Sequence, residues 1–526
     1  MSKKNALLIL LLITSLGFAI RLSFIIGSDF PLHDGGFFYV MIQDLLSNGF
    51  VLPDFSSFNQ AHIPFIYPPL GLYLVGAIEY LTGASRLQLF RIIPLVVTTL
   101  TIPAYYYLAN EIVKDKRASL AAAAVFSLLP RGYIWLILGG GVTRSFGALF
   151  GILALIFVIR FVESGGWIAG ILGTLFCGFT VLSHPEWAWF LFYSTGFFII
   201  LKLIAREKKV FFRSFLIFLG TTAIILPWLL NILSRHGQTI FLPLLDSGFS
   251  RWNDVIKFLL LEWSGEILFP VITLLSITGI VQSAKERAWF AVFWLPLVFL
   301  LQGRAAYQRA VIPLALLAGI GITAIFKHLN SRYLNKMNAP KISIIALGIY
   351  TYVLMGSLIF GAGEFRPLQE QHLESFNWIS QETPADSKIL VITGKDWTYD
   401  SYSEWMAALT GRSSVSLVQG YEWLPGFSDR ASQYYQFQYE YSKGMTDLVS
   451  WINQNHIRVD FLVLPKGDEA EIRQWSSEPA LHWHDAALFP GADKVFENES
   501  VLILDLRGVM DPTPYYGEIE LKGTSP

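Results

Sequence analysis

The chain has 526 residues, of which 53% are hydrophobic and 15% aromatic. Its mean hydropathy of +0.48 excludes an ordinary soluble globular domain. The formal net charge of −1 shows no overall basic excess, and we expect no nucleic-acid partner. The single cysteine, Cys177, excludes an intramolecular disulfide, and its apolar setting favours a packed small residue over a nucleophile.

Apolar stretches recur along the first two thirds of the chain, most of them roughly 17–23 residues long, enough to cross a ~30 Å hydrocarbon layer as a helix. The first follows Lys3 and Lys4 and lacks a convincing cleavage site, so we expect a retained anchor. We predict about twelve membrane segments: 6–26, 67–83, 91–113, 118–138, 143–162, 167–183, 187–204, 214–233, 266–283, 288–302, 308–326 and 341–361.

Charge divides the chain into two domains. Residues 364–526 contain 25 acidic and 12 basic residues, a net −13, and the remainder carries +12. We therefore predict a membrane domain at 1–363, with an outer loop at 27–66, and a soluble domain at 364–526. Short basic loops are typical of the cytoplasmic side, and four stretches fit: 114–117, 206–213, 285–287 and 327–341. This bias places the N-terminus in the cytoplasm and the C-terminal domain outside.

One segment disturbs this topology. Two full crossings between residues 67 and 113 would place the basic "KDKR" loop outside. The segment 67–83 opens with "YPP" and contains Glu79, so we expect it to be re-entrant or only half-spanning. Eleven true crossings then remain.

The acidic domain alternates helices with short strands. A helical pattern at 369–383 precedes a buried strand at 388–393, "MTDLVSWINQNH" precedes "VDFLVLP", and a further strand is expected at 500–506. We predict a small α/β domain with a mostly parallel sheet. No phosphate loop, metal-spaced cluster or GxSxG is present. Glu404 and Trp405 in "SEWM" are the residues of interest there.

Chemistry-bearing residues gather at the expected outer ends of the apolar segments. They lie in the first loop, in "IYPPLGLY", beside the glycine run 139–141, in "LSHPEW" and in "QGRAAYQRAVIP". The candidates are His33, Asp34, Tyr67, Arg144, His184, Glu186, Arg304, Tyr307 and Arg309. Structural roles are also open: Asp34 as a cap for a helix beginning near Phe37, arginines as head-group anchors, and His184 with Glu186 as a structural pair.

In combination, these features resemble the GT-C superfamily of integral-membrane glycosyltransferases. Within it, the early "HDGG", the "YPP", the "SHPE" and the "ESFNWISQETPADSKILVI" segment resemble the family of protein O-mannosyltransferases and the lipid A aminoarabinose transferase. Many members carry two adjacent acidic residues in the first loop, whereas Gly35 follows Asp34 here. The resemblance implies a GT-C-like bundle of about 11–12 membrane segments in a prokaryotic plasma membrane.

The resemblance also implies an activity. Such enzymes transfer a hexosyl or pentosyl group from a polyprenyl-phosphate sugar donor to a protein, lipid or glycan acceptor. Asp34 is then the general base of an inverting displacement, and Arg304 and Arg309, assisted by Arg144, bind the donor phosphate. His33 orients the acceptor or tunes Asp34, and the two glycines let the backbone approach a substrate. Tyr67, His184, Glu186 and Tyr307 complete the expected substrate site.

Other interpretations stay open at this stage. Asp34, His184 and Glu186 would make an oxygen/nitrogen metal site if the outer loops converge, but we predict no metal and no other cofactor. A polysaccharide polymerase or ligase also uses polyprenyl-linked donors. A transporter or flippase of lipid-linked sugars would show repeats and ionisable groups near the middle of the bilayer. The halves of this chain do not resemble one another, and the interiors of its apolar segments are nearly free of charge.

Overall fold

The computed structural model describes residues 1–241, 251–266, 269–329, 367–466 and 483–510, with a few positions between 348 and 359. Contacts divide the chain into two units. The membrane unit comprises Met1–Leu32, Ile66–Gly237 and Gly248–Arg366, and the sheet unit comprises His33–Phe65, Gln238–Ser247 and Pro367–Pro526. The expected domain boundary at 363/364 lies outside the described residues. Residues 33–65, expected with the membrane domain, are grouped with the sheet unit instead.

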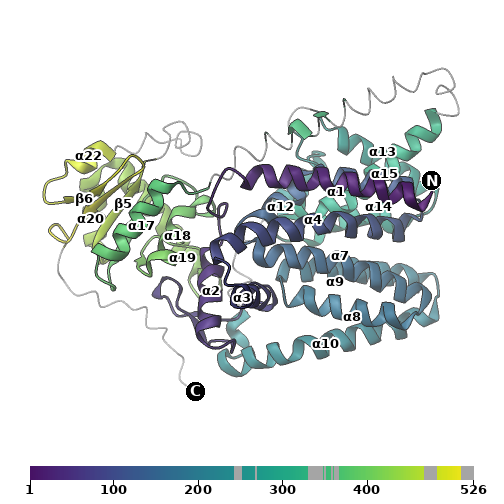
Figure 1. Ribbon diagram of the computed structural model, residues 1–526, viewed down its shortest axis with the longest axis horizontal. Coiled ribbons are helices and arrows are strands. Elements are labelled where there is room, and N and C mark those ends of the chain that lie inside the picture. Colours follow the sequence, from purple (N-terminus) through teal and green to yellow (C-terminus); the bar gives the residue numbers. More distant parts are fainter. Residues whose placement is uncertain are drawn as a thin grey trace. The chain divides into compact units, whose positions relative to one another are not determined.

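The membrane unit is a helical bundle (Figure 1). In its described part, six helices are long and apolar enough to cross a membrane: α1 (Lys3–Ile25), α4 (Arg86–Val113), α7 (Gly141–Ser164), α9 (Pro185–Ile204), α10 (Lys208–His236) and α15 (Ala306–Leu329). Shorter apolar helices are α3 (Leu70–Thr82), α8 (Trp167–Val181), α13 (Val271–Lys285) and α14 (Trp289–Leu301). This is a multi-pass membrane protein, as predicted.

Three of the expected membrane segments are not full-length helices of the described bundle. Helix α3 has 13 residues, which at 1.5 Å per residue is about 20 Å and fits a half-spanning segment. The expected single span 118–138 is wrong: α5 (Lys116–Leu128) ends before a 3₁₀ turn at Pro130–Gly132, and α6 (Ile134–Ile137) follows. Leu129 is extended because the following proline excludes helical backbone there. Most of the twelfth expected segment, 341–361, lies outside the described residues.

Small residues allow the bundle helices to approach closely. A Cβ at Gly279 of α13 would lie 1.9 Å from the carbonyl oxygen of Leu317 in α15. A Cβ at Gly319 of α15 would lie 2.5 Å from the carbonyl oxygen of Ala118 in α5. Membrane helices associate mainly through such packing, since lipid offers no hydrophobic drive between them. The glycines therefore set the positions of α5, α13 and α15.

One ionisable side chain lies within this packing. Arg21 of α1 is only 1% exposed. Its Nη1 donates to the carbonyls of Gly17 at 2.9 Å and Ser127 at 3.1 Å, and its guanidinium lies 4.3 Å from the ring centre of Tyr133. These contacts compensate for removing the charge from water. Arg21 joins α1 to the break after α5 and is structural.

The sheet unit is built on five strands in the order β4-β3-β5-β7-β6. They are β3 (Lys388–Val391), β4 (Ser413–Ser414), β5 (Phe461–Pro465), β6 (Asp493–Glu497) and β7 (Val501–Asp505). β3 pairs in parallel with β4 and β5, whereas β7 pairs antiparallel with β5 and β6. The three expected strands are confirmed as β3, β5 and β7. The prediction of a mostly parallel sheet is wrong: β7 runs antiparallel to both of its neighbours, so the sheet is mixed.

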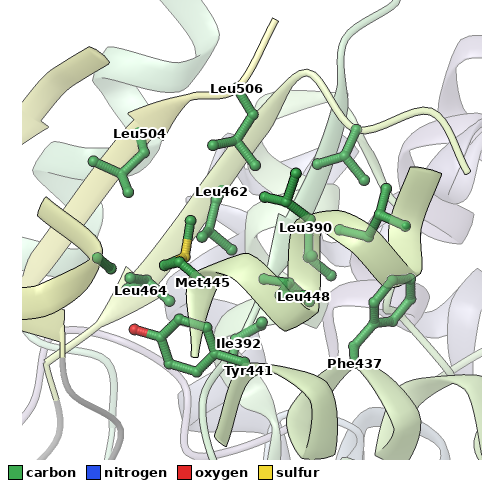
Figure 2. Close-up of a cluster of buried hydrophobic side chains, with 14 of the residues drawn as sticks. Leu390, Ile392, Phe437, Tyr441, Met445, Leu448, Leu462, Leu464, Leu504 and Leu506 are labelled. Atoms are coloured by element: carbon green, nitrogen blue, oxygen red, sulfur yellow. The ribbon is translucent and has the colours of Figure 1, made fainter. Parts of the chain in front are cut away.

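Helices cover this sheet. Their bounds are α17 (Glu370–Glu382), α18 (Ser401–Thr410), α19 (Phe427–Lys443), α20 (Met445–Gln454) and α22 (Trp483–Ala487). Figure 2 shows Leu390, Leu462 and Leu504 of the strands facing Phe437 and Leu448 of α19 and α20. These five side chains are fully buried, so the hydrophobic effect drives the packing of helices against sheet.

The first loop packs against the same unit. It contains α2 (Gly36–Ser47) and the short strands β1 (Phe55–Ser56) and β2 (Ile63–Pro64), which pair antiparallel. Asn59 Nδ2 donates to the carbonyl of Ser414 at 3.0 Å, and the N–H of Ser414 donates to Asn59 Oδ1 at 2.6 Å. The amide therefore pairs with the edge strand β4 as a neighbouring strand would. This is why residues 33–65 are grouped with the sheet.

Candidate functional site

The candidate residues fall into two groups, one in each unit. The arginine cluster, in the membrane unit, comprises Arg144, His184, Glu186, Arg304 and Arg309. The first-loop site, in the sheet unit, comprises His33, Asp34 and Glu404.

The arginine cluster forms where helices begin. Arg144 lies in the first turn of α7, His184 is the N-cap of α9, and Glu186 lies in the first turn of α9. A carboxylate is stabilised at a helix N-terminus by the aligned peptide dipoles. A Cβ at Gly147 of α7 would lie 2.8 Å from the Cβ of His184, so this glycine allows the two helix starts to meet.

Arg309 is the most buried member of the cluster. It lies in α15, is 2% exposed, and its Nη2 pairs with Glu186 Oε2. Nη1 donates to Gln308, and the guanidinium lies 5.2 Å from the ring centre of Trp187. Both terminal nitrogens of Arg309 therefore already have protein partners. Arg309 is better suited to holding the cluster together than to binding a ligand with both nitrogens. The charges of Arg309, Arg144 and Arg304 all act on His184 and Glu186.

Arg304 and Arg144 are more accessible. Arg304 is exposed in the turn before α15, and Arg144 is half-buried with its guanidinium 5.6 Å from the ring centre of Trp135. Positive charge that water and ligands can reach is suited to binding a phosphate.

The two candidate tyrosines flank this cluster. Tyr67 meets His184 edge-on at 6.4 Å, and its hydroxyl lies 3.2 Å from that of Thr143 in α7. Tyr307 is flanked by Arg131, at 5.1 Å from its ring centre, and by Lys257, at 5.4 Å. Lys257, in α12 (Arg251–Leu259), was missed by sequence reasoning because its segment is amphipathic rather than apolar. The structure thus brings six predicted site residues together within the membrane unit: Tyr67, Arg144, His184, Glu186, Arg304 and Arg309, with Tyr307 two positions before Arg309.

The first-loop site surrounds the start of α2. Asp34 is half-buried and precedes Gly35, whose φ of +126° is a backbone conformation that favours glycine. Helix α2 begins at Gly36, and its N-cap is Gly35. The alternative in which Asp34 is the N-cap residue is therefore wrong, because Asp34 lies one position before the cap. The capping carboxylate comes from α18 instead: Glu404 Oε1 accepts from the N–H of Gly35 at 3.2 Å and of Phe37 at 3.0 Å.

The second glycine makes room for Glu404. A Cβ at Gly36 would lie 2.9 Å from the backbone oxygen of Glu404 and 3.0 Å from its Cγ. We expected both glycines to let the backbone approach a substrate. At Gly36 the missing side chain instead lets α2 pack closely against α18. On the other side of Asp34, Trp405 Nε1 donates to the carbonyl of His33 at 2.8 Å.

The ring of His33 is held as well. His33 is 6% exposed and meets Tyr399 edge-on at 5.7 Å. Its neighbours place the imidazole in a packed setting beside Asp34. The other acidic and imidazole residues of the loop act locally: Asp44 accepts three hydrogen bonds from Ser56 and Ser57, and His62 lies against Phe55.

Burial and neighbouring negative charge change the pKa of Glu404. Burial, with the charge of Asp34 and a smaller contribution from Glu422, raises the pKa of Glu404 to about 8. At neutral pH the Glu404 carboxyl is therefore mostly protonated. Among the described residues, no three His, Cys, Asp or Glu side chains form a group that could hold a metal ion.

No family model and no curated protein sequence matches this chain. Solved structures do. The oligosaccharyltransferase of Archaeoglobus fulgidus, solved in complex with zinc and sulfate, is 14% identical, with a TM-score of 0.61 over 86% of this chain and 68% of its own. ArnT from Cupriavidus metallidurans, bound to undecaprenyl phosphate, is 13% identical, with a TM-score of 0.52 over 97% of this chain and 100% of its own.

A third structure is longer than this chain. The arabinofuranosyltransferase AftD from Mycobacteria is 13% identical, with a TM-score of 0.58 over 96% of this chain but only 40% of its own. All three are GT-C glycosyltransferases. The chain therefore has the GT-C fold, and the resemblance expected from its motifs is confirmed at the level of fold.

Proposed function

We propose that this protein is a membrane glycosyltransferase that transfers a sugar from a polyprenyl-phosphate donor to an acceptor hydroxyl at the outer face of a plasma membrane. The observation that carries the proposal is the arginine cluster within a GT-C fold. Its accessible cations suit a lipid-linked phosphate, and undecaprenyl phosphate is the ligand of the ArnT structure that matches 97% of this chain.

In this proposal Asp34 is the general base. Its carboxylate takes the proton of the acceptor hydroxyl as that oxygen attacks the anomeric carbon of the donor. The bond from the anomeric carbon to the phosphate oxygen breaks, and the polyprenyl phosphate leaves with the electron pair. A single displacement from the opposite face inverts the anomeric configuration.

Arg304 and Arg144 hold the donor phosphate and stabilise the negative charge that develops on it. Arg309 and Glu186 keep the helix starts of α9 and α15 together and fix the shape of the cluster. Tyr67, His184 and Tyr307 are assigned to the donor side. His33, beside Asp34, orients the acceptor.

The decisive test is transfer by the purified full-length protein from radiolabelled polyprenyl-phosphate sugars. Mannose, glucose, aminoarabinose and arabinofuranose donors are screened against membrane acceptors. We expect Asp34→Asn to lower kcat at least a hundredfold, since loss of a general base typically costs ~10²–10⁴. Asp29→Asn is the matched control, because Asp29 has an exposed side chain in the same loop.

The outcomes separate the alternatives. If Asp34→Asn and Asp29→Asn both transfer sugar at the wild-type rate, Asp34 is not the general base, although the proposed transferase activity still holds. Retention of configuration in the product would contradict the single displacement. A wild-type protein that moves a lipid-linked sugar across vesicles without transferring it would favour a flippase, and one that joins preassembled glycan chains would favour a polymerase or ligase.

A further inference from the structure

Glu404 is the buried acidic residue whose contacts lie closest to the proposed base. It is 3% exposed in α18, and the start of that helix is fixed by Asp400. The Asp400 carboxylate accepts from Ser403 N–H at 3.0 Å and from Ser403 Oγ at 2.6 Å. Asp400 is itself 1% exposed and accepts from the hydroxyl of Tyr434 at 3.1 Å. The backbone that carries Glu404 is therefore rigidly placed.

Contacts from α18 bracket Asp34 along the chain. Before it, the carbonyl of His33 accepts from Trp405, and after it, the N–H groups of Gly35 and Phe37 donate to Glu404. Trp405 is fully buried and also meets Tyr39 edge-on at 5.8 Å. Two consecutive residues of α18 thus fix the backbone on both sides of one carboxylate.

We propose that Glu404 is a positioning residue for Asp34: its buried carboxyl, supplied by the C-terminal part of the chain, holds the first turn of α2 and thereby sets where the Asp34 carboxylate points. The catalytic half of this inference rests on the proposed function. The C-terminal domain then belongs to the proton-transfer apparatus rather than serving as a separate module.

The charge state of Glu404 is part of the same arrangement. The charged groups that act on it most strongly are Asp34, from the segment before α2, and Glu422, from the 3₁₀ turn Tyr421–Trp423. Both are acidic, and both raise the pKa of Glu404. A protonated Glu404 accepts the two N–H bonds through Oε1 without adding a second negative charge beside Asp34. A glutamine has the same shape and acceptor, so Glu404→Gln imitates the protonated acid and Glu404→Ala removes the contact.

The first experiment needs no substrate. Hydrogen exchange is measured on the full-length protein for wild type, Glu404→Ala, Glu404→Gln and Glu440→Ala. Glu440 is a buried glutamate of α19 that binds Lys443 and Gln436, so it controls for loss of any buried carboxyl. We expect amides 35–39 to exchange at least tenfold faster in Glu404→Ala and unchanged in the other two variants. Wild-type exchange in Glu404→Ala would overturn the proposal.

The second experiment measures kinetics on the same four proteins. We expect Glu404→Ala to lower kcat at least tenfold with the donor KM within twofold, and Glu404→Gln to stay within threefold of wild type at pH 7. Above pH 8, wild-type kcat should fall reversibly as Glu404 ionises beside Asp34, and Glu404→Gln should lack this alkaline limb. A rise in KM without a fall in kcat, or an unchanged alkaline limb in Glu404→Gln, would overturn the positioning role.

A further variant covers the case in which Glu404→Ala does not fold. Gly36→Ala places a methyl group against the Glu404 backbone and should accelerate exchange at 35–39 and lower kcat in the same way. Gly27→Ala is its control, since a Cβ there meets nothing within 4 Å. If Asp34→Asn abolishes transfer while Glu404→Ala and Gly36→Ala do not lower it, the inference fails and the proposed function stands. If no donor is used by wild type, the function fails while the exchange data still decide the structural contact.

Discussion

The arginine cluster and the first-loop site handle charge in opposite ways. The cluster gathers three arginines around one carboxylate, Glu186, whose partner is Arg309. The first-loop site contains Asp34 and Glu404, and the two charges that raise the pKa of Glu404 most, those of Asp34 and of nearby Glu422, are both negative. An excess of cations is suited to binding an anion. Carboxyl groups that lie close together repel one another's charge, which raises the pKa of at least one of them and suits such a site to holding and moving protons.

The two steps of the proposed reaction make different demands on charge. Stabilising a departing phosphate needs fixed positive charge, which arginine retains at every physiological pH. Accepting a proton from a hydroxyl needs an ionised carboxylate in a defined position. The two tasks require different electrostatic surroundings, and the chain assigns them to residues in two separately packed units.

The largest effect is expected from neutralising the accessible cations. We expect the double variant Arg144→Ala with Arg304→Ala to raise the donor KM at least about 100-fold, because hydrogen bonds to charged groups contribute about 1.5–3 kcal/mol each and every ~1.4 kcal/mol is a tenfold change in affinity. Isothermal titration with undecaprenyl phosphate measures the same loss without turnover. Hydrogen exchange at residues 35–39 should not change, and faster exchange there would mean that the two sites are not independent.

A smaller effect concerns stability and pH. Folding raises the pKa of Glu404 from 4.5 to about 8, so between these values the folded state binds more protons than the unfolded state. Wild-type stability should therefore fall as pH rises from about 5 to 8, by at most about 5 kcal/mol at ~1.4 kcal/mol per pKa unit. Glu404→Gln lacks this titration and should match wild type near pH 5 and exceed its Tm near pH 9.

Intrinsic tryptophan fluorescence during heating gives these Tm values in detergent. Because other groups also titrate, the informative quantity is the difference between variant and wild type at each pH. Asp34→Asn removes the nearest negative charge and should weaken the pH dependence without abolishing it. A constant difference between Glu404→Gln and wild type across the range would contradict the assignment of Glu404 as protonated.

The smallest expected effect is that of metal removal. We predict that transfer does not depend on a divalent ion, because Glu186 is paired with Arg309 and Glu404 Oε1 with two backbone N–H groups. Dialysis against EDTA should leave kcat within twofold, and adding Mg²⁺ or Mn²⁺ should not raise it. Loss of activity that Mn²⁺ restores would contradict this prediction.

Much of the architecture could be predicted from the sequence. Apolar length locates α1, α4, α7 and α9, because a helix must cover the hydrocarbon layer. Strand composition predicts β3, β5 and β7. The break after α5 was missed although Pro130 signalled it, since the apolar run continues through residues 133–138. The direction of β7 was missed because strand patterns carry no information on pairing partner.

The candidate site was only partly accessible to sequence reasoning. Six of its predicted residues meet in the membrane unit because they cluster at helix starts, which hydropathy and proline locate. Whether they bind a donor stays a prediction, as does the role of Asp34. Lys257 and the contact between Glu404 and α2 had no local signal: Glu404 lies 369 positions after Gly35.

Length, hydropathy and charge are properties of each segment alone, so the amino-acid sequence suffices to predict a multi-pass bundle, an acidic α/β part and the supply of arginines and carboxyl groups. Three features come from the packing of distant segments: α18 holds "HDGG", Gly36 leaves room for Glu404, and Arg309 pairs with Glu186. These depend on which distant surfaces pack together, and on the burial that follows. Burial changes the pKa of Glu404, and no local pattern around residue 404 encodes it.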